Sequence, residues 1–251
     1  MALDFSGKIA VVTGGAHGIG QAAAAALRAG GARVWVFDID RAADVVVDVT
    51  DRESIDHAFL QCGPPDIVVA NAGTGSEADL TETSRDLWDR TIALNLTGVF
   101  ETVQAAASLM KARRKGAIVI TASTNSYDGE ARLAAYNASK AGVLGILHTA
   151  ANELGPYGIR VNAVCPGLIR TRLTERHFSH PEVLKDYFRD IPLGRGGEAH
   201  EVGAAIAFLA SDLASFITGA ALLVDGGQMA SKFGTWNEET AEFSSGAWKL
   251  K

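Results

Sequence analysis

Two residues with acid–base side chains, Tyr136 and Lys140, lie four positions apart in a stretch with a helical pattern. Side chains at this spacing share one helix face, so the phenol and the ammonium can serve one site. A free tyrosine has a pKa of about 10, which is too high for an efficient base at neutral pH, but an adjacent positive charge lowers it. Tyr136 is therefore a candidate general acid/base. The same spacing is also common on helix surfaces, so the assignment needs support from other residues.

Ser123 and Asn95 place polar side chains in apolar surroundings. Ser123 follows the apolar run 118–121 and lies thirteen residues before Tyr136. Its hydroxyl is suited to hold a substrate oxygen and to stabilise charge that develops there. Asn95 interrupts a long helical pattern where core packing alone would favour an apolar residue. A satisfied core asparagine is the alternative interpretation.

A glycine-rich loop near the N-terminus has the composition of a nucleotide-binding loop. The run Thr13-Gly14-Gly15-Ala16-His17-Gly18-Ile19-Gly20 follows an apolar strand pattern and opens a helical pattern. Glycines allow tight turning and close backbone approach, and a helix N-terminus presents free amides to a pyrophosphate. A bare glycine repeat would fit a structural turn equally well, but the strand–loop–helix context predicts dinucleotide binding.

An acidic residue, Asp38, ends the second predicted strand, eighteen residues after Gly20. A carboxylate at this place can accept hydrogen bonds from the adenosine ribose hydroxyls, and its charge repels a 2′-phosphate. We therefore expect NAD rather than NADP. A solvated strand-end aspartate is the alternative, and the neighbouring Arg41 is the one feature that would weaken the preference.

Short apolar runs alternate with longer helical patterns along nearly the whole chain, which predicts a parallel sheet covered on both faces. The seven expected strands are Lys8–Thr13, Ala32–Asp38, Val45–Asp48, Asp66–Ala70, Gly116–Thr121, Arg160–Val164 and Ala220–Val224. The expected helices are Ile19–Ala29, Arg52–Gln61, Ser84–Ala112, Leu133–Leu154 and His200–Ser211. This order is typical of a single-domain, Rossmann-like doubly wound α/β fold. Six residues between Asp38 and Val45 are too few for a crossover helix, so we expect a shortened, extended second crossover.

The order of these motifs resembles the short-chain dehydrogenase/reductase family over roughly residues 5–227. The resemblance rests on the glycine loop, Asn71-Ala72-Gly73 after a strand, Asn95, Ser123, Tyr136 with Lys140, and Pro166-Gly167. It implies that Asn95, Ser123, Tyr136 and Lys140 are catalytic, with Lys140 also binding the nicotinamide ribose and Asn95 holding a water that links Lys140 to solvent.

The resemblance also implies contacts with the cofactor. Asp48 and Val49 should border the adenine, and Thr171 should contact the nicotinamide carboxamide. His17 in the loop can approach phosphate or face solvent. The expected cofactor-binding residues are Gly14, His17, Gly18, Ile19, Gly20, Asp38, Asp48, Val49, Asn71, Ala72, Gly73, Tyr136, Lys140, Pro166, Gly167, Ile169 and Thr171.

The expected activity is NAD-dependent interconversion of a secondary alcohol and a ketone. The segment between Ser123 and Tyr136, and a lid from Leu168 to Ile191, are rich in polar side chains. They favour a small polar substrate such as a sugar, a polyol or a hydroxy acid. Reduction of a 3-oxoacyl thioester is the alternative, which Asp38 disfavours because NADPH more often serves that reaction. A nucleotide-binding regulator without catalysis is disfavoured by the intact Ser, Tyr, Lys and Asn set.

Bulk composition excludes several other classes of protein. The 251 residues are 47% hydrophobic and 21% charged with a formal net charge of -6, which fits one folded unit. No dense Lys/Arg run predicts nucleic-acid binding, and no apolar stretch predicts a membrane span. Cys62 and Cys165 show no disulfide or metal-ligand pattern. We expect a cytoplasmic protein with reduced thiols and no metal site.

Two features concern assembly. The helical patterns Ser84–Ala112 and Leu133–Leu154 carry many small residues that let helices approach closely, and the family resemblance implies a homotetramer packed through them. Beyond the dehydrogenase domain, residues 1–227, a tail of residues 228–251 carries Phe233, Trp236, Phe243 and Trp248. Burying such aromatics is favourable, so the tail should dock on its own subunit or on a neighbour near the cleft. A mobile terminus is the alternative.

Overall fold

The computed structural model describes residues 3–231 and 234–251. Its centre is a seven-stranded sheet in which every neighbouring pair of strands is parallel. The spatial order is β3 (Val45–Val46), β2 (Arg33–Asp38), β1 (Ile9–Thr13), β4 (Ile67–Ala70), β5 (Gly116–Thr121), β6 (Ile159–Pro166) and β9 (Ala221–Val224). The chain order reverses between β1 and β4, which confirms the predicted doubly wound α/β fold.

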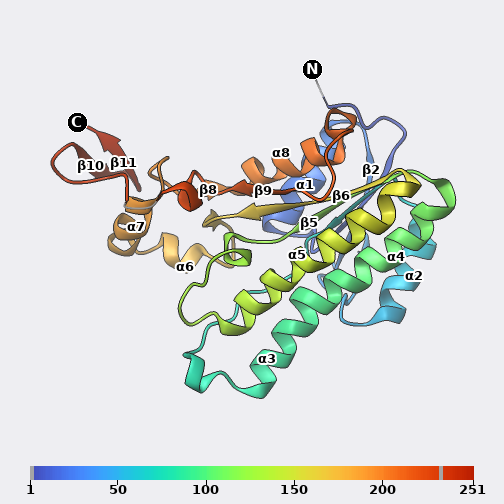
Figure 1. The fold of residues 1–251 in the computed structure, drawn as a ribbon, viewed down its shortest axis with the longest axis horizontal. Coiled ribbons are helices and arrows are strands. Elements are labelled where there is room, and N and C mark those ends of the chain that lie inside the picture. Colours follow the sequence, from blue (N-terminus) through green and yellow to red (C-terminus); the bar gives the residue numbers. More distant parts are fainter. Residues whose placement is uncertain (1–2, 232–233) are drawn as a thin grey trace.

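Helices cover both faces of this sheet (Figure 1). One apolar cluster joins the sheet to α1 (Gly18–Ala29) and α8 (Ala199–Ala210). The second joins it to α2 (Arg52–Cys62), α4 (Gly98–Arg113) and α5 (Ala134–Leu154). Because both faces are covered, the central strands are mostly apolar, and all four residues of β4 are buried. The polar side chains therefore collect at the strand ends.

The connection between β2 and β3 is short, as predicted. Residues 39–44 form turns and bends, and Asp38 pairs with Val46 across the two parallel strands. The Asp44 carboxylate fixes this loop because its Oδ2 accepts hydrogen bonds from the Val36 amide at 2.8 Å and from Arg28 Nη2 at 3.3 Å. The Asp44 side chain thus anchors this connection, which has no crossover helix.

The prediction of one long helix from Ser84 to Ala112 was wrong in one respect. The segment consists of α3 (Arg85–Ile92), a π-helical stretch at Ala93–Thr97, and α4. Ser84 begins it as an N-cap, accepting a hydrogen bond from the Leu87 amide at 3.1 Å. The π-turn fits one extra residue into the helix, and such insertions are frequent at functional sites. Its consequence is that Asn95 is completely buried.

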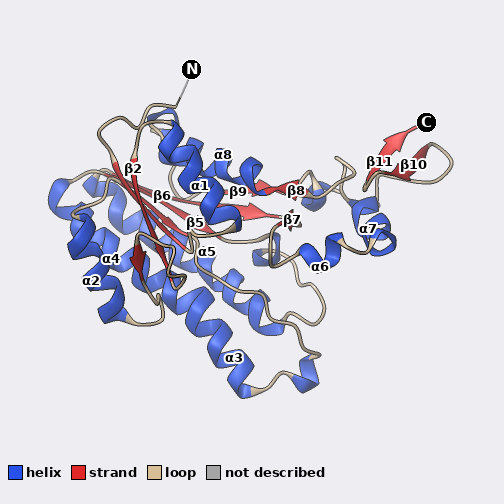
Figure 2. Ribbon diagram, turned by 180° about the vertical axis from the view of Figure 1, so that it is seen from behind, coloured by secondary structure: helices blue, strands red, loops and turns tan. Residues whose placement is uncertain are grey.

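The C-terminal half adds small elements beyond the carboxyl ends of the strands. They are β7 (Ile169–Arg170), α6 (Glu175–Phe178), α7 (Pro181–Tyr187) and β8 (Gly197–Glu198), with a hairpin of β10 (Ala241–Ser244) and β11 (Ala247–Leu250). Figure 2 shows the hairpin next to α7, on the side away from the sheet. The sequence had not indicated this hairpin, and Phe233 lies outside the described residues.

Candidate active site

In the loop between β1 and α1, neighbouring backbone atoms occupy the space that side chains of Gly14 and Gly20 would need. A Cβ atom on Gly14 would lie 2.7 Å from the Ala72 Cα, and one on Gly20 would lie 2.2 Å from the Gly14 carbonyl oxygen. Asn71 ties the loop to the end of β4, because its Nδ2 donates to the carbonyl oxygens of Thr13 and Gly14, each at 3.1 Å. The loop therefore requires glycine for close packing, and it joins the carboxyl end of β1 to the N-terminus of α1. These residues fit a dinucleotide pyrophosphate.

Asp38 lies at the outer side of the same loop. Its carboxylate accepts hydrogen bonds from the Ala16 amide at 3.0 Å and from the Asp40 amide at 3.1 Å. The charge is thus held in place at the end of β2. His17 is directed to Asp40, with 3.0 Å between Nε2 and Oδ2, and this contact contributes to a lowered pKa of Asp40, after the Ala42 amide.

The catalytic candidates meet at the carboxyl end of β5. Lys140, on α5, is almost fully buried, and its Nζ donates to the Thr121 carbonyl oxygen at 2.9 Å. The same Nζ lies 5.7 Å from the centroid of the Tyr136 ring. Ser123 Oγ accepts a hydrogen bond from the Asn125 amide at 3.1 Å, which holds the hydroxyl at the start of the 3₁₀ turn Thr124–Ser126. Strand and helix thus bring Ser123, Tyr136 and Lys140 together.

Asn95 joins this group from the π-helical stretch. Its Oδ1 accepts from the Thr74 amide and its Nδ2 donates to the Thr74 carbonyl oxygen, both at 2.8 Å. A Cβ atom placed on Gly73 would lie 3.2 Å from Asn95 Oδ1 and 3.7 Å from Lys140 Nζ. The missing side chain of Gly73 therefore leaves a space between the amide and the ammonium.

Burial shapes the acid–base properties of the site. Burial lowers the pKa of Lys140 to about 8. Burial also raises the pKa of Tyr136, and an interaction with the Ser123 side chain acts against that rise. Cys165 lies at the end of β6, and burial raises its pKa to about 11, so this thiol is protonated at neutral pH. A neutral buried thiol is a poor nucleophile.

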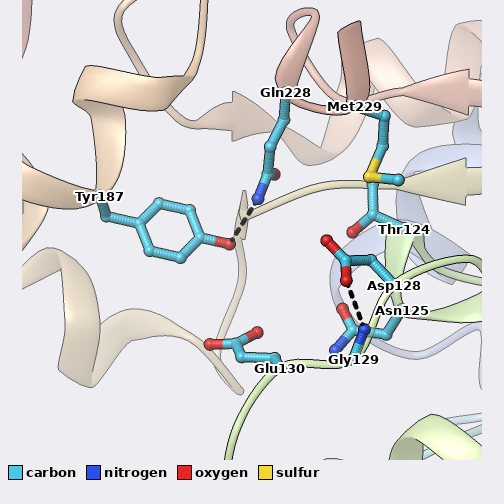
Figure 3. A pocket seen from close by; sticks show the side chains of 8 residues that line it. All are labelled: Thr124, Asn125, Asp128, Gly129, Glu130, Tyr187, Gln228 and Met229. Atoms are coloured by element: carbon cyan, nitrogen blue, oxygen red, sulfur yellow. Dashed lines mark hydrogen bonds between the residues drawn. The ribbon is translucent and has the colours of Figure 1, made fainter. Parts of the chain in front are cut away.

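A cavity of about 180 Å³ is lined in part by Thr124 and Asn125, which directly follow Ser123 in the chain (Figure 3). It is lined by the loop after β5 and by the C-terminal region: Thr124, Asn125, Asp128, Gly129, Glu130, Tyr187, Gln228 and Met229. Among the described residues that line it, two are acidic and none is basic. Basic side chains of the predicted lid are engaged elsewhere, since Arg176 pairs with Glu77 and Arg170 lies 3.6 Å from Glu198.

The remaining residues that we expected to bind the cofactor differ in burial and in their hydrogen bonds. Thr171 lies over the loop, because a Cβ on Gly18 would come within 3.3 Å of its Cγ2. Val49 and Ile169 are 4% exposed and belong to the two large apolar clusters. The Asp48 carboxylate accepts hydrogen bonds from Thr50 N at 2.9 Å and Oγ1 at 2.7 Å. Pro166 and Gly167 follow at the end of β6.

Three lining residues of the cavity were not predicted individually, although Tyr187 lies in the predicted lid and Gln228 and Met229 begin the predicted tail. They belong to no motif with a fixed spacing, and their nearest landmarks are the lid segment and the Asp225-Gly226-Gly227 turn. The Asp225 carboxylate holds that turn by accepting from the amides of Gly227 and Met229, each at 2.9 Å. An acidic residue before a glycine pair was the one available signal.

Comparison with known proteins agrees with this geometry. Residues 14–229 match a family model described as enoyl-(acyl carrier protein) reductase. The chain is 39% identical over 249 residues to trans-4-hydroxycyclohexanecarboxylate dehydrogenase of Sinomonas cyclohexanicum, covering 89% of this chain and 93% of that protein. It is 37% identical over 246 residues to 3-oxoacyl-(acyl-carrier-protein) reductase of Thermotoga maritima, covering 90% and 99%.

A solved structure resembles the whole fold. It is a protein of Agrobacterium tumefaciens with bound NADP, named provisionally as a 2-deoxy-d-gluconate 3-dehydrogenase. The TM-score is 0.86 at 35% sequence identity, and the match covers 91% of this chain and 99% of the other.

These matches, with the fold and the site, define an oxidoreductase that uses a nicotinamide cofactor and acts on CH–OH groups. The chain belongs to the short-chain dehydrogenase/reductase family, as its motifs predicted. Within the described part of the chain, no helix is both long enough and apolar enough to cross a membrane.

Proposed function

We propose that this protein is an NAD-dependent dehydrogenase that interconverts a secondary alcohol and a ketone on a small sugar or polyol. The observation that carries the proposal is the convergence of Ser123, Tyr136, Lys140 and Asn95 on one strand end, next to a small polar cavity. Bound at the glycine loop, the nicotinamide cofactor supplies the hydride acceptor or donor.

Asp38 supports NAD as the cofactor. Two backbone amides hold its carboxylate at the end of β2, so the charge cannot easily turn away from an incoming 2′-phosphate. The same oxygens are suited to accept hydrogen bonds from ribose hydroxyls. The Agrobacterium structure contains NADP, so cofactor preference must be measured for this chain directly.

In the oxidative direction, Tyr136 removes the proton from the substrate hydroxyl while Ser123 holds the substrate oxygen. Lys140 stabilises the phenolate by its nearby positive charge. The proton leaves through Lys140 and a water held near Asn95, for which the missing side chain of Gly73 leaves space between the two side chains. His17, Ile19, Asp48, Ala72 and the other loop residues named above bind and orient the cofactor.

The charge of the cavity favours an uncharged substrate among the three expected classes. Asp128 and Glu130 line it without a basic neighbour in the described lining, so a carboxylate would meet repulsion there. Hydroxyl groups of a sugar or polyol can instead donate hydrogen bonds to these oxygens. The Sinomonas relative acts on a hydroxy acid, so we expect the two proteins to differ in this respect.

Reduction of 3-oxoacyl thioesters is the second candidate function, and the Thermotoga relative favours it. One panel separates the two. Sugars, polyols, hydroxy acids and 3-oxoacyl thioesters are assayed with each cofactor by nicotinamide absorbance. We expect turnover of a neutral polyol or sugar with NAD; a higher kcat/KM for a 3-oxoacyl thioester with NADPH would replace the proposal by the alternative.

We further propose a homotetramer packed through α4 and α5. Phe100 on α4 is 43% exposed, and α5 exposes Ala138, Ala141 and Gly145 on one face. A Cβ on Gly145 would meet no atom within 4 Å, so another helix can approach closely. Light scattering at micromolar concentration tests this assembly, and a monomer there contradicts it. The boundary at residue 227 and the cytoplasmic location also stay predictions.

A further inference from the structure

The C-terminal hairpin and helix α7 form an apolar cluster of their own. Its buried members are Leu184, Phe188, Ile191, Ala241 and Trp248. Trp248 is 3% exposed, although only three residues follow it in the sequence. Its ring stacks on Trp236 with 6.5 Å between centroids and contacts Phe243 edge-on at 5.7 Å. The hairpin therefore packs on its own subunit's lid.

Helix α7 needs this support, because it has seven residues and isolated helices of fewer than about 12 residues are marginal in water. The tail supplies hydrogen-bond donors to carbonyl groups at and after the end of α7. Trp248 Nε1 donates to the Lys185 carbonyl oxygen, and Trp236 Nε1 to that of Ile191, both at 2.9 Å. The backbone amide of Trp248 donates a hydrogen bond to the Gly194 carbonyl oxygen at 2.9 Å.

Gly194 shows that the docking is close. Its φ is +67°, and a Cβ there would lie 3.0 Å from the Trp248 Cβ and 3.1 Å from the Trp236 ring. A larger residue at this position would push the hairpin away from the lid. Lys185 adds an ion pair with Glu238, between α7 and the tail.

The opposite side of α7 faces the substrate cavity. Tyr187, its last residue, lines the cavity with Glu130 and Gln228 (Figure 3). Gln228 Nε2 donates to the Tyr187 hydroxyl oxygen at 3.3 Å, which leaves the phenol proton free for another acceptor. Tyr187 lies next to Phe188. The ring centroid of Phe188 is 6.4 Å from that of Phe243 in the hairpin.

We infer that Tyr187 donates a hydrogen bond to the substrate and that Trp248 is a positioning residue that holds it at the cavity. The hairpin thus takes part in substrate selection from the far side of the lid. The identity of the substrate rests on the proposed function, but the positioning does not. Trp248 does not line the cavity, so its effect must pass through α7 and through residues 188–194, which follow α7.

The kinetic test compares Tyr187→Phe, Trp248→Ala and the double variant. Loss of one hydrogen bond should raise KM for the alcohol about 3–10-fold in each single variant, with kcat and KM for NAD unchanged. The double variant should show no more than the larger single effect, because both changes remove one interaction. Trp248→Phe should fall between Trp248→Ala and the parent. Leu250→Ala is the matched control, since Leu250 is on the same strand and 75% exposed.

A second measurement does not require turnover. Hydrogen exchange of the amides in residues 181–191 should be faster in Trp248→Ala than in the parent, with the sheet amides unchanged. If no alcohol is oxidised but this difference appears, the proposed function fails and the positioning stands. Trp248→Ala with an unchanged KM and unchanged lid exchange, or additive KM effects in the double variant, would overturn the inference.

Discussion

The sheet edge and the lid place their side chains by different means. At the edge, Asn95, Ser123 and Lys140 are 0%, 6% and 4% exposed and are held by strands and long helices that share the two large cores. In the lid, short elements form a separate apolar cluster with the C-terminal hairpin, and Leu173 and Val183 are more than half exposed. We therefore expect the catalytic residues to lie in the most stable part of the molecule and the substrate-selecting residues in a part that opens more easily.

The difference between the sheet edge and the lid indicates where substitutions leave catalysis intact. A change at the sheet edge alters packing, hydrogen bonding and chemistry together, because each side chain has several fixed partners. A change in the lid alters the cavity while the catalytic set stays in place. Substitutions at the edge should therefore act on kcat, and those in the lid on KM.

The largest effect is expected for Tyr136→Phe. The ring still packs, but the oxygen that exchanges the proton is gone, so kcat should fall by about 10²–10⁴-fold. Binding of NAD, measured by fluorescence titration, should persist within about twofold of the parent. Residual kcat close to that of the parent would assign the acid/base to another residue and would break the contrast between edge and lid.

A smaller effect is expected for Asp38→Ala. The variant loses hydrogen bonds to the ribose and the repulsion of a 2′-phosphate, so the preference for NAD should narrow by about 10–150-fold. The ratio of kcat/KM for the two cofactors measures it. Because Asp38 also holds the Ala16 amide, Asp38→Asn is the control that keeps a hydrogen-bond acceptor while removing the charge. Equal or better efficiency of the parent with NADP contradicts the assignment.

The pH dependence of oxidation should reflect the Tyr136–Lys140 pair. Burial lowers the pKa of Lys140 to about 8 and raises the pKa of Tyr136, so the pair releases its first proton near pH 8, and oxidation uses the form in which Tyr136 has lost the proton and Lys140 stays charged. Oxidation requires that loss, so its rate should rise about tenfold per pH unit below a limb at or below pH 8 and then level off. Lys140→Arg should move the limb, because guanidinium stays charged. A flat profile across this range would contradict the proton route.

The smallest effect is expected for Glu130→Gln in the cavity. Glu130 has no charged group to neutralise it among the described lining residues, and its charge is one of the influences that raise the pKa of Tyr136. Removing an exposed charge should improve kcat/KM for a hydroxy acid relative to a neutral polyol by up to about fivefold. Glu82→Gln, on the surface away from the cavity, should leave the ratio unchanged. An unchanged ratio in Glu130→Gln would remove the charge argument for a neutral substrate.

The sequence was sufficient for the sheet edge because its residues obey local rules. Strand patterns, the glycine loop and the Tyr136–Lys140 spacing each depend on nearby positions in the chain. The π-turn at Asn95 could not be predicted from the sequence, because one inserted residue changes the helical pattern of apolar positions too little to be recognised. The position of Tyr187 could not be read either, since it depends on Trp248, 61 residues further along. Docking between such distant segments leaves no periodic pattern.

The short link between β2 and β3 has a consequence for engineering. Its six residues, 39–44, replace a whole crossover unit, and they lie at the rim of the sheet beside Asp38. A segment of this size can be exchanged with that of a homologue while the helices that cover both faces stay untouched. The Asp44 anchor to Val36 must be kept, since it fixes the ends of the loop. If the exchanged segment also includes Asp38, the residue that we expect to set the cofactor preference, the choice of nicotinamide cofactor can be changed separately from the choice of substrate.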